Sequence, residues 1–138
     1  MLPSLHISMH LFKMPESMFS RMTIHFKRGD HISKSLLQEI EKSQIAVIVF
    51  SINYANSQWC LNELVKIMEC HKTIGQVVLP IFYNVDPSEV RHQKGEFGKA
   101  FQSLLNKISN EFFNLEPCWR AALREAADLA GFIFLNSR

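Results

Sequence analysis

Cysteine is scarce in this chain, which has three cysteines among 138 residues. They are Cys60, Cys70 and Cys118, and no two of them form a C-x-x-C pair. An odd number at these spacings predicts neither a disulfide framework nor a metal site. No signal peptide is recognisable, so we expect a reducing, cytoplasmic location, with the nucleus as an alternative. The longest apolar run is far shorter than the roughly 20 residues that a membrane span needs, and no membrane association is expected.

A large excess of one charge is also lacking. The net charge is +2, and the lysines and arginines are scattered along the chain, which argues against a surface for nucleic acid or anionic lipid. Apolar residues make up 47% of the chain and charged residues 20%, which is typical of a globular protein. A chain of this length is expected to form a single domain with a sizeable core.

The strongest structural signal is a short apolar run, Ile45–Phe50. Every position in it is apolar and several are β-branched, which is typical of a parallel strand buried on both faces. The turn-forming residues Ser51 and Asn53 follow directly, and a helix with an apolar stripe is predicted over 58–72. Ligands of open α/β sheets bind outside the carboxyl ends of the strands, so this junction is the candidate site.

Trp59 and Glu63 are the side chains at this junction that most suggest chemistry. They are four residues apart, so on a helix they share one face near its first turn. Ser51 and Asn53 are candidate pocket-lining donors. Each has a plainer interpretation: a solvated glutamate, a tryptophan at the edge of the core, and two turn formers. Cys60 is expected to be a small buried hydrophobe and not a nucleophile, because a nucleophile needs a basic neighbour.

Strand and helix signals alternate toward the C-terminus. A second buried strand is predicted over 77–82, and its Pro80 removes a ladder donor, so this strand should lie toward a sheet edge or contain a break. Asp86 and Pro87 are typical of the start of a helix, and Gly95 is expected to end it. Further segments are helices over 97–108 and 119–130, a weaker strand signal at 112–113 and an apolar stretch over 132–135. Such alternation predicts an α/β fold with a parallel sheet.

The N-terminal third gives weaker signals. Leu5–Leu11 alternates apolar and polar residues, as a half-exposed strand does. A short helix over 13–21, a short strand over 23–26 and a helix over 33–42 are the other predicted elements.

Two long segments resemble the plant Toll/interleukin receptor (TIR) domain, the N-terminal module of many plant immune receptors. They run from Arg28 to Cys70 and from Val77 to Phe101, and the second contains the specific sequence PIFYNVDPSEVR. The resemblance implies a flavodoxin-like, three-layer α/β sandwich around a parallel sheet. It makes residues 1–138 a single TIR domain, family-like over 28–131 and atypical over 1–27.

The resemblance also implies a function and a site. Family members act in innate immunity, associate with other TIR domains, and cleave NAD+ or NADP+ at the nicotinamide–ribose bond; these are substrates, and no cofactor is implied. Glu63 matches the family's catalytic glutamate, and Trp59 is its neighbour. Arg28, Gly29 and Asp30 match the end of the BB loop, which covers the substrate and joins protomers.

Arg91 and His92 follow the Asp-Pro-Ser-Glu-Val segment, and both are expected to face solvent. The resemblance adds the alternative that they contact a neighbouring protomer.

One departure from the family bears on activity. Plant members normally begin with a strand and loop of the type D-V-F-L-S-F-R-G-E-D-T-R, and this chain has no such segment. Since that strand is central in the family sheet, its loss would leave a row of buried backbone groups unpaired. We expect Leu5–Leu11 to take its place. The alternative function is a truncated, inactive TIR adaptor that acts only through TIR–TIR contacts. A phosphoryl-accepting receiver is excluded, because Asp86 is the only acidic residue at a strand end.

Overall fold

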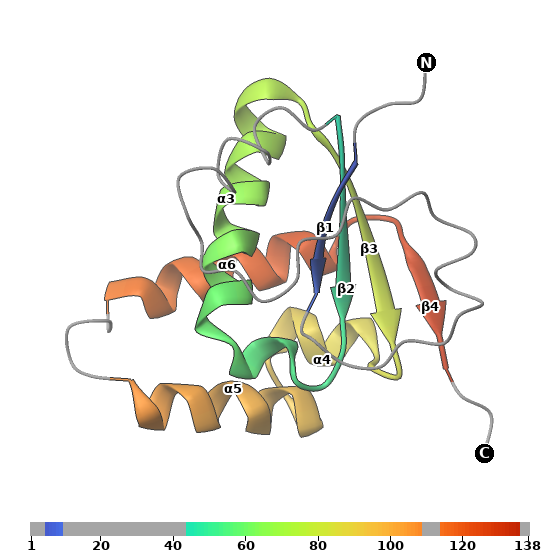
Figure 1. The fold of residues 1–138 in the computed structure, drawn as a ribbon. Coiled ribbons are helices and arrows are strands. Elements are labelled where there is room, and N and C mark those ends of the chain that lie inside the picture. The colour runs from blue at the N-terminus through green and yellow to red at the C-terminus, as the bar shows by residue number, and fades with distance from the viewer. Residues whose placement is uncertain (1–4, 10–43, 109–113, 136–138) are drawn as a thin grey trace.

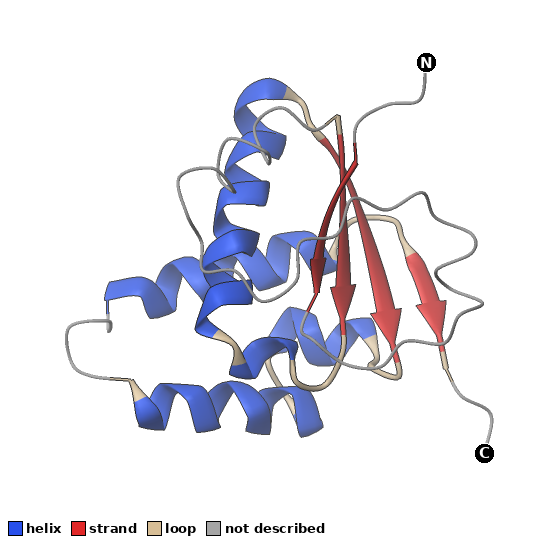
Figure 2. Ribbon diagram, in the orientation of Figure 1, coloured by secondary structure: helices blue, strands red, loops and turns tan. Residues whose placement is uncertain are grey.

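The computed structural model describes residues 5–9, 44–108 and 114–135. In this part of the chain, four parallel strands form one sheet in the order β1-β2-β3-β4 (Figures 1 and 2). The strands are β1 (Leu5–Met9), β2 (Ile45–Phe50), β3 (Val77–Tyr83) and β4 (Phe132–Phe134). The α/β fold with a parallel sheet is therefore confirmed.

The described helices follow β2 and β3 in the chain. They are the 3-10 helix η1 (Tyr54–Asn56) and the α-helices α3 (Gln58–Ile74), α4 (Pro87–His92), α5 (Gly95–Lys107) and α6 (Glu116–Ala127). Figure 1 shows that they gather on one side of the sheet. Of the described helices, none is long and apolar enough to cross a bilayer.

Strand β2 forms the middle of the hydrophobic core. It pairs with β1 on one side and β3 on the other. Because successive side chains point to opposite faces, Ile48 and Phe50 join the large cluster beneath the helices, whereas Val47 and Val49 join Ile7 and a smaller cluster on the other face. The prediction of a strand buried on both faces is confirmed.

The helices predicted over 13–21 and 33–42, together with the strand over 23–26, lie outside the described residues. So do Arg28, Gly29 and Asp30, and the weak strand signal at 112–113. The third layer of the predicted sandwich is likewise not among the described elements.

Strand β1 lies beside β2, in the position where the sequence predicted a replacement strand. The strand predicted over Leu5–Leu11 is confirmed for Leu5–Met9, which pairs in parallel with β2. Leu5 lies opposite Ile45, and Met9 lies opposite Val49. The backbone groups of β2 therefore have strand partners on both sides.

Pro80 lies within β3, which pairs with β2 on one side and with β4 on the other. Strand β3 is thus an inner strand that lies next to the outer strand β4, which agrees with the prediction of a strand toward the sheet edge. Pairing with β4 begins only at Ile81, and a Cβ on Gly131 would overlap the carbonyl oxygen of Pro80. That carbonyl thus faces the side where the β4 ladder has not yet begun. Since the nitrogen and the carbonyl of one strand residue point the same way, no ladder bond to β2 is lost.

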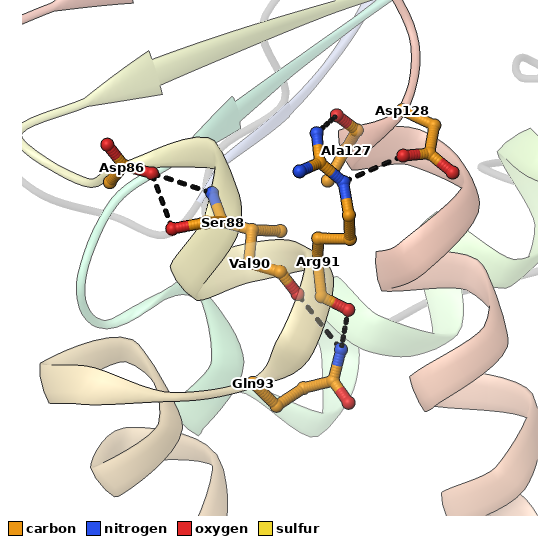
Figure 3. Close-up of polar contacts among 7 residues, drawn as sticks. All are labelled: Asp86, Ser88, Val90, Arg91, Gln93, Ala127 and Asp128. Carbon is orange, nitrogen blue, oxygen red and sulfur yellow. Dashed lines mark hydrogen bonds and ion pairs between the residues drawn. The ribbon is translucent and has the colours of Figure 1, made fainter.

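Helix α4 ends at a glutamine, and the prediction that Gly95 ends it is wrong. Gln93 has a positive φ of 50°, the left-handed conformation that terminates many helices. Its side-chain amide donates to the carbonyls of Val90 and Arg91, both at 2.9 Å (Figure 3). These bonds satisfy carbonyls at the helix end and favour a conformation that usually selects glycine. Gly95 instead opens α5.

Candidate functional site

The candidate site is built at the carboxyl end of β2. The chain turns immediately after the strand, with the Tyr54 N–H donating to the Ser51 carbonyl at 3.1 Å. Ser57 then caps α3, because its hydroxyl oxygen accepts the Cys60 N–H at 3.1 Å. The first turns of α3 are thereby fixed beside the end of the sheet.

Glu63 lies on the buried side of α3, with 8% of its surface exposed. It is the only acidic residue among the buried residues that the structure describes. On the same helix Glu69 is exposed, so the burial of Glu63 follows from its position on the helix. Burying a carboxylate is unfavourable unless it is paired, so a buried glutamate is unusual. The plainer interpretation of Glu63 as a solvated helix residue is therefore wrong.

The other predicted site residues lie in different environments. Trp59, one turn before Glu63, is half-buried, and Asn53 is exposed on the turn. Ser51 is 7% exposed, and its hydroxyl has no hydrogen-bond partner among the residues that the structure describes. Buried hydroxyls are normally paired, so Ser51 is a group that a ligand could satisfy.

Cys60 does not behave as a nucleophile. Burial raises the pKa of its thiol to about 12; the Ser57 hydrogen bond opposes this rise, and the nearby Glu63 carboxylate adds to it. The thiolate is the reactive form, so at neutral pH this cysteine is an inert, neutral side chain. It is the small buried residue that the sequence predicts.

The sequence did not predict a hydrogen-bonded chain that links β1 to α3. The hydroxyls of Ser8 and Tyr54 lie 2.7 Å apart, and the Tyr54 hydroxyl donates to the Cys60 carbonyl at 3.1 Å. Burial raises the pKa of Tyr54 well above its usual value, as do the neighbouring Cys60 and Glu63. The one sequence signal for this link is a polar residue inside a strand, and nothing local connects it to a tyrosine 46 residues away.

The Asp-Pro-Ser-Glu-Val-Arg segment forms α4 and is held against α6 (Figure 3). Arg91 donates from Nε to Asp128 at 2.7 Å and from Nη2 to the Ala127 carbonyl at 3.1 Å. The expectation that Arg91 simply faces solvent is therefore wrong, because its guanidinium fastens two helices together. His92 is exposed, as predicted.

Known proteins are similar to this chain over most of its length. The profile of the TIR domain family matches residues 6–138. Disease resistance protein RPV1 of Vitis rotundifolia is 53% identical over 112 residues, which cover 81% of this chain and 8% of that protein. TMV resistance protein N of Nicotiana glutinosa is 53% identical over 103 residues, which cover 75% of this chain and 9% of that protein. Disease resistance protein RPS6 of Arabidopsis thaliana is 44% identical over 118 residues, which cover 81% of this chain and 10% of that protein. The chain thus spans a tenth or less of the length of these relatives.

The fold is similar to a solved structure as well. The TIR domains of the activated Roq1 resistosome, which directly recognises the pathogen effector XopQ, superpose with a TM-score of 0.69 at 39% identity. The similar region covers 86% of this chain and 74% of that one. The parallel sheet and the helices beside it agree with this similarity. In sequence and in fold, the chain belongs to the TIR domain family.

Proposed function

We propose that this chain cleaves NAD+ or NADP+ at the nicotinamide–ribose bond and acts in plant innate immune signalling. The catalytic group in this proposal is the carboxylate of Glu63. The observation that carries it is the burial of this one acidic side chain on α3, next to the carboxyl end of β2. Parallel α/β sheets bind their ligands in that region.

The chemistry needs a negative charge near the ribose. As the bond from the ribose C1 to the nicotinamide nitrogen breaks, its electron pair stays on nitrogen and C1 gains oxocarbenium character. A carboxylate shielded from water stabilises that charge more strongly than an exposed one does. Nicotinamide leaves as a neutral molecule and needs no acid. Water then adds to C1 and releases a proton, giving ADP-ribose, or a ribose hydroxyl takes the place of water.

Two neighbouring side chains fit roles in binding. Trp59 is half-buried, one helical turn before Glu63, and offers a flat surface on which a ring can stack. Ser51 has a buried hydroxyl that lacks a partner in the described part of the chain, and it can bond a ribose hydroxyl or a phosphate oxygen. In the proposal Arg28, Gly29 and Asp30 belong to the loop that covers the substrate, and Asn53 lies at the rim.

Association with other TIR domains is the second part of the proposal. The similarity to the TIR domains of an assembled resistosome supports it. The alternative function is an adaptor that associates in this way without cleaving nucleotide.

The test is release of nicotinamide from NAD+ and, separately, NADP+ by concentrated protein, followed by chromatography. Wild type should release it and Glu63→Gln should not, although the amide keeps the size of the side chain. Glu69→Gln is the matched control, because Glu69 lies on the same helix but is exposed, and it should retain activity. No release by wild type, combined with co-elution with a second TIR domain, would overturn the enzymatic proposal in favour of the adaptor.

A further inference from the structure

We infer that Tyr54, held by Ser8, is a positioning residue for Glu63 and fixes the start of α3 against β1. This inference rests on the proposed function, since it concerns how the proposed catalytic carboxylate is held in place.

The link begins at a polar group in an apolar layer. Ser8 is fully buried in β1 and lies opposite Ile48 of β2, so it points toward the face that the helices cover. The other strand residues buried on this face of β2 and β3 are apolar, namely Ala46, Ile48, Phe50, Val78, Pro80 and Phe82. A hydroxyl in such a layer must find a partner, and Ser8 finds Tyr54 at 2.7 Å.

The direction of both hydrogen bonds follows from the proton count. A phenol has one proton, and that of Tyr54 is donated to the Cys60 carbonyl at 3.1 Å. The Ser8 hydroxyl therefore donates to the Tyr54 oxygen. Two consecutive bonds thus run from β1 to the backbone of the first turn of α3. The tyrosine ring is itself fully buried and packs edge-on against Phe50 at 4.9 Å between ring centroids.

This anchor lies next to Glu63 along the helix. Cys60 precedes Glu63 by three residues, so the two residues are neighbours on one side of α3. The Glu63 carboxylate raises the pKa of both Tyr54 and Cys60, which is consistent with its facing this group. Since burial and these neighbours keep the phenol protonated, Tyr54 remains a donor across the neutral pH range. Small displacements of a catalytic group lower the reaction rate strongly, and a shift of about 1 Å can lower it by ~100-fold.

Tyr54→Phe is the decisive variant, because it keeps the ring and removes only the hydroxyl. We expect kcat for NAD+ cleavage to fall by about tenfold, with KM changed by less than about twofold. Ser8→Ala should lower kcat in the same sense. The double variant should be no worse than Tyr54→Phe alone, because the two side chains act as one unit.

Asn62→Ala is the matched control. Asn62 also lies on α3 and accepts a part-buried hydrogen bond from the Trp119 indole N–H at 3.0 Å, but this bond leads to α6. The control should therefore keep kcat within about twofold of wild type. An equal loss of kcat in Tyr54→Phe and Asn62→Ala would mean general loosening and would overturn the inference.

Amide hydrogen exchange over residues 58–64 gives a readout that does not need turnover. Tyr54→Phe should speed exchange there more than Asn62→Ala does, and unchanged exchange would overturn the inference. If wild type releases no nicotinamide, the proposed function fails. The exchange experiment then decides by itself whether Tyr54 anchors α3.

Discussion

The Trp119 indole N–H donates to the Asn62 side-chain oxygen at 3.0 Å and joins α6 to α3. Trp119 is fully buried and packs edge-on against Phe101, with 6.5 Å between the ring centroids. The packing of this ring should therefore outweigh its single hydrogen bond. Trp119→Ala should lower the free energy of unfolding by about 3–5 kcal/mol, and Asn62→Ala by about 1 kcal/mol. Urea denaturation followed by circular dichroism measures both, and equal losses would contradict this view.

Gly131 should tolerate alanine far less well than Gly75. A Cβ on Gly131 would overlap the backbone carbonyl of Pro80, which cannot move without disturbing the sheet. Gly75 has a φ of +71°, but apart from its chain neighbours no atom of the described residues lies within 4 Å of an added Cβ. Gly75→Ala should therefore cost only about 1–2 kcal/mol, from the left-handed conformation. Calorimetry should give a much larger drop in Tm for Gly131→Ala, and similar values for the two variants would show that β4 adapts freely.

The three thiols should differ sharply in reactivity. Cys118 is exposed, whereas Cys60 and Cys70 are buried. Because burial raises the pKa of Cys60 to about 12, iodoacetamide at neutral pH should modify Cys118 quickly and spare the other two. Peptide mass spectrometry identifies the modified residue. Rapid labelling of Cys60 in folded protein would contradict its neutral, enclosed state.

Asp86 caps the N-terminus of α4, and this cap should make the stability of the fold depend on pH. The Ser88 hydroxyl and then the Ser88 backbone N–H, at 2.6 and 2.8 Å from Asp86 Oδ1, lower the pKa of Asp86 (Figure 3). A carboxyl with a lower pKa in the folded state stabilises the fold above its unfolded pKa. That contribution is lost as the pH falls through the folded pKa.

Asp86→Ala should therefore lower Tm at neutral pH, and its difference from wild type should shrink in acid. Melting curves from about pH 7 to about pH 2 follow this difference through the usual pKa of an aspartate and below it. Ser88→Ala keeps the backbone bond and should give a smaller, similarly pH-dependent loss. A difference that stays constant over this range would rule out the cap as its source.

The elements with strong local signals were predictable from the sequence. The uniformly apolar composition of Ile45–Phe50 predicted β2, and Asp86 followed by Pro87 predicted the start of α4. By contrast, the end of α4 depends on side-chain bonds of Gln93, which no propensity encodes. Whether Pro80 fits an inner strand depends on where β4 begins, a fact about a segment about 50 residues later in the chain.

The candidate site, too, could be predicted from the sequence only in part. The resemblance to a family selected Glu63, and its burial came only with the fold. The Ser8–Tyr54 link joins residues 46 apart and required knowledge of which strand lies beside β2. The attachment of Arg91 to α6 is equally non-local, since Asp128 is 37 residues away. Local pattern thus placed the elements, while tertiary contacts decided what their polar side chains do.

Strand β4 has a practical consequence for anyone purifying this domain. It is one of the two outer strands of the described sheet and only three residues long. Three nearby apolar side chains are each more than half exposed, namely Phe132, Ile133 and Leu135. Exposed apolar side chains on an edge strand favour aggregation of the protein. The shortness of β4 limits the number of backbone hydrogen bonds that a second molecule can form with it. Dilute, low-salt buffers will therefore suit this protein, and a lysine in place of Ile133 is the substitution of choice for raising its solubility.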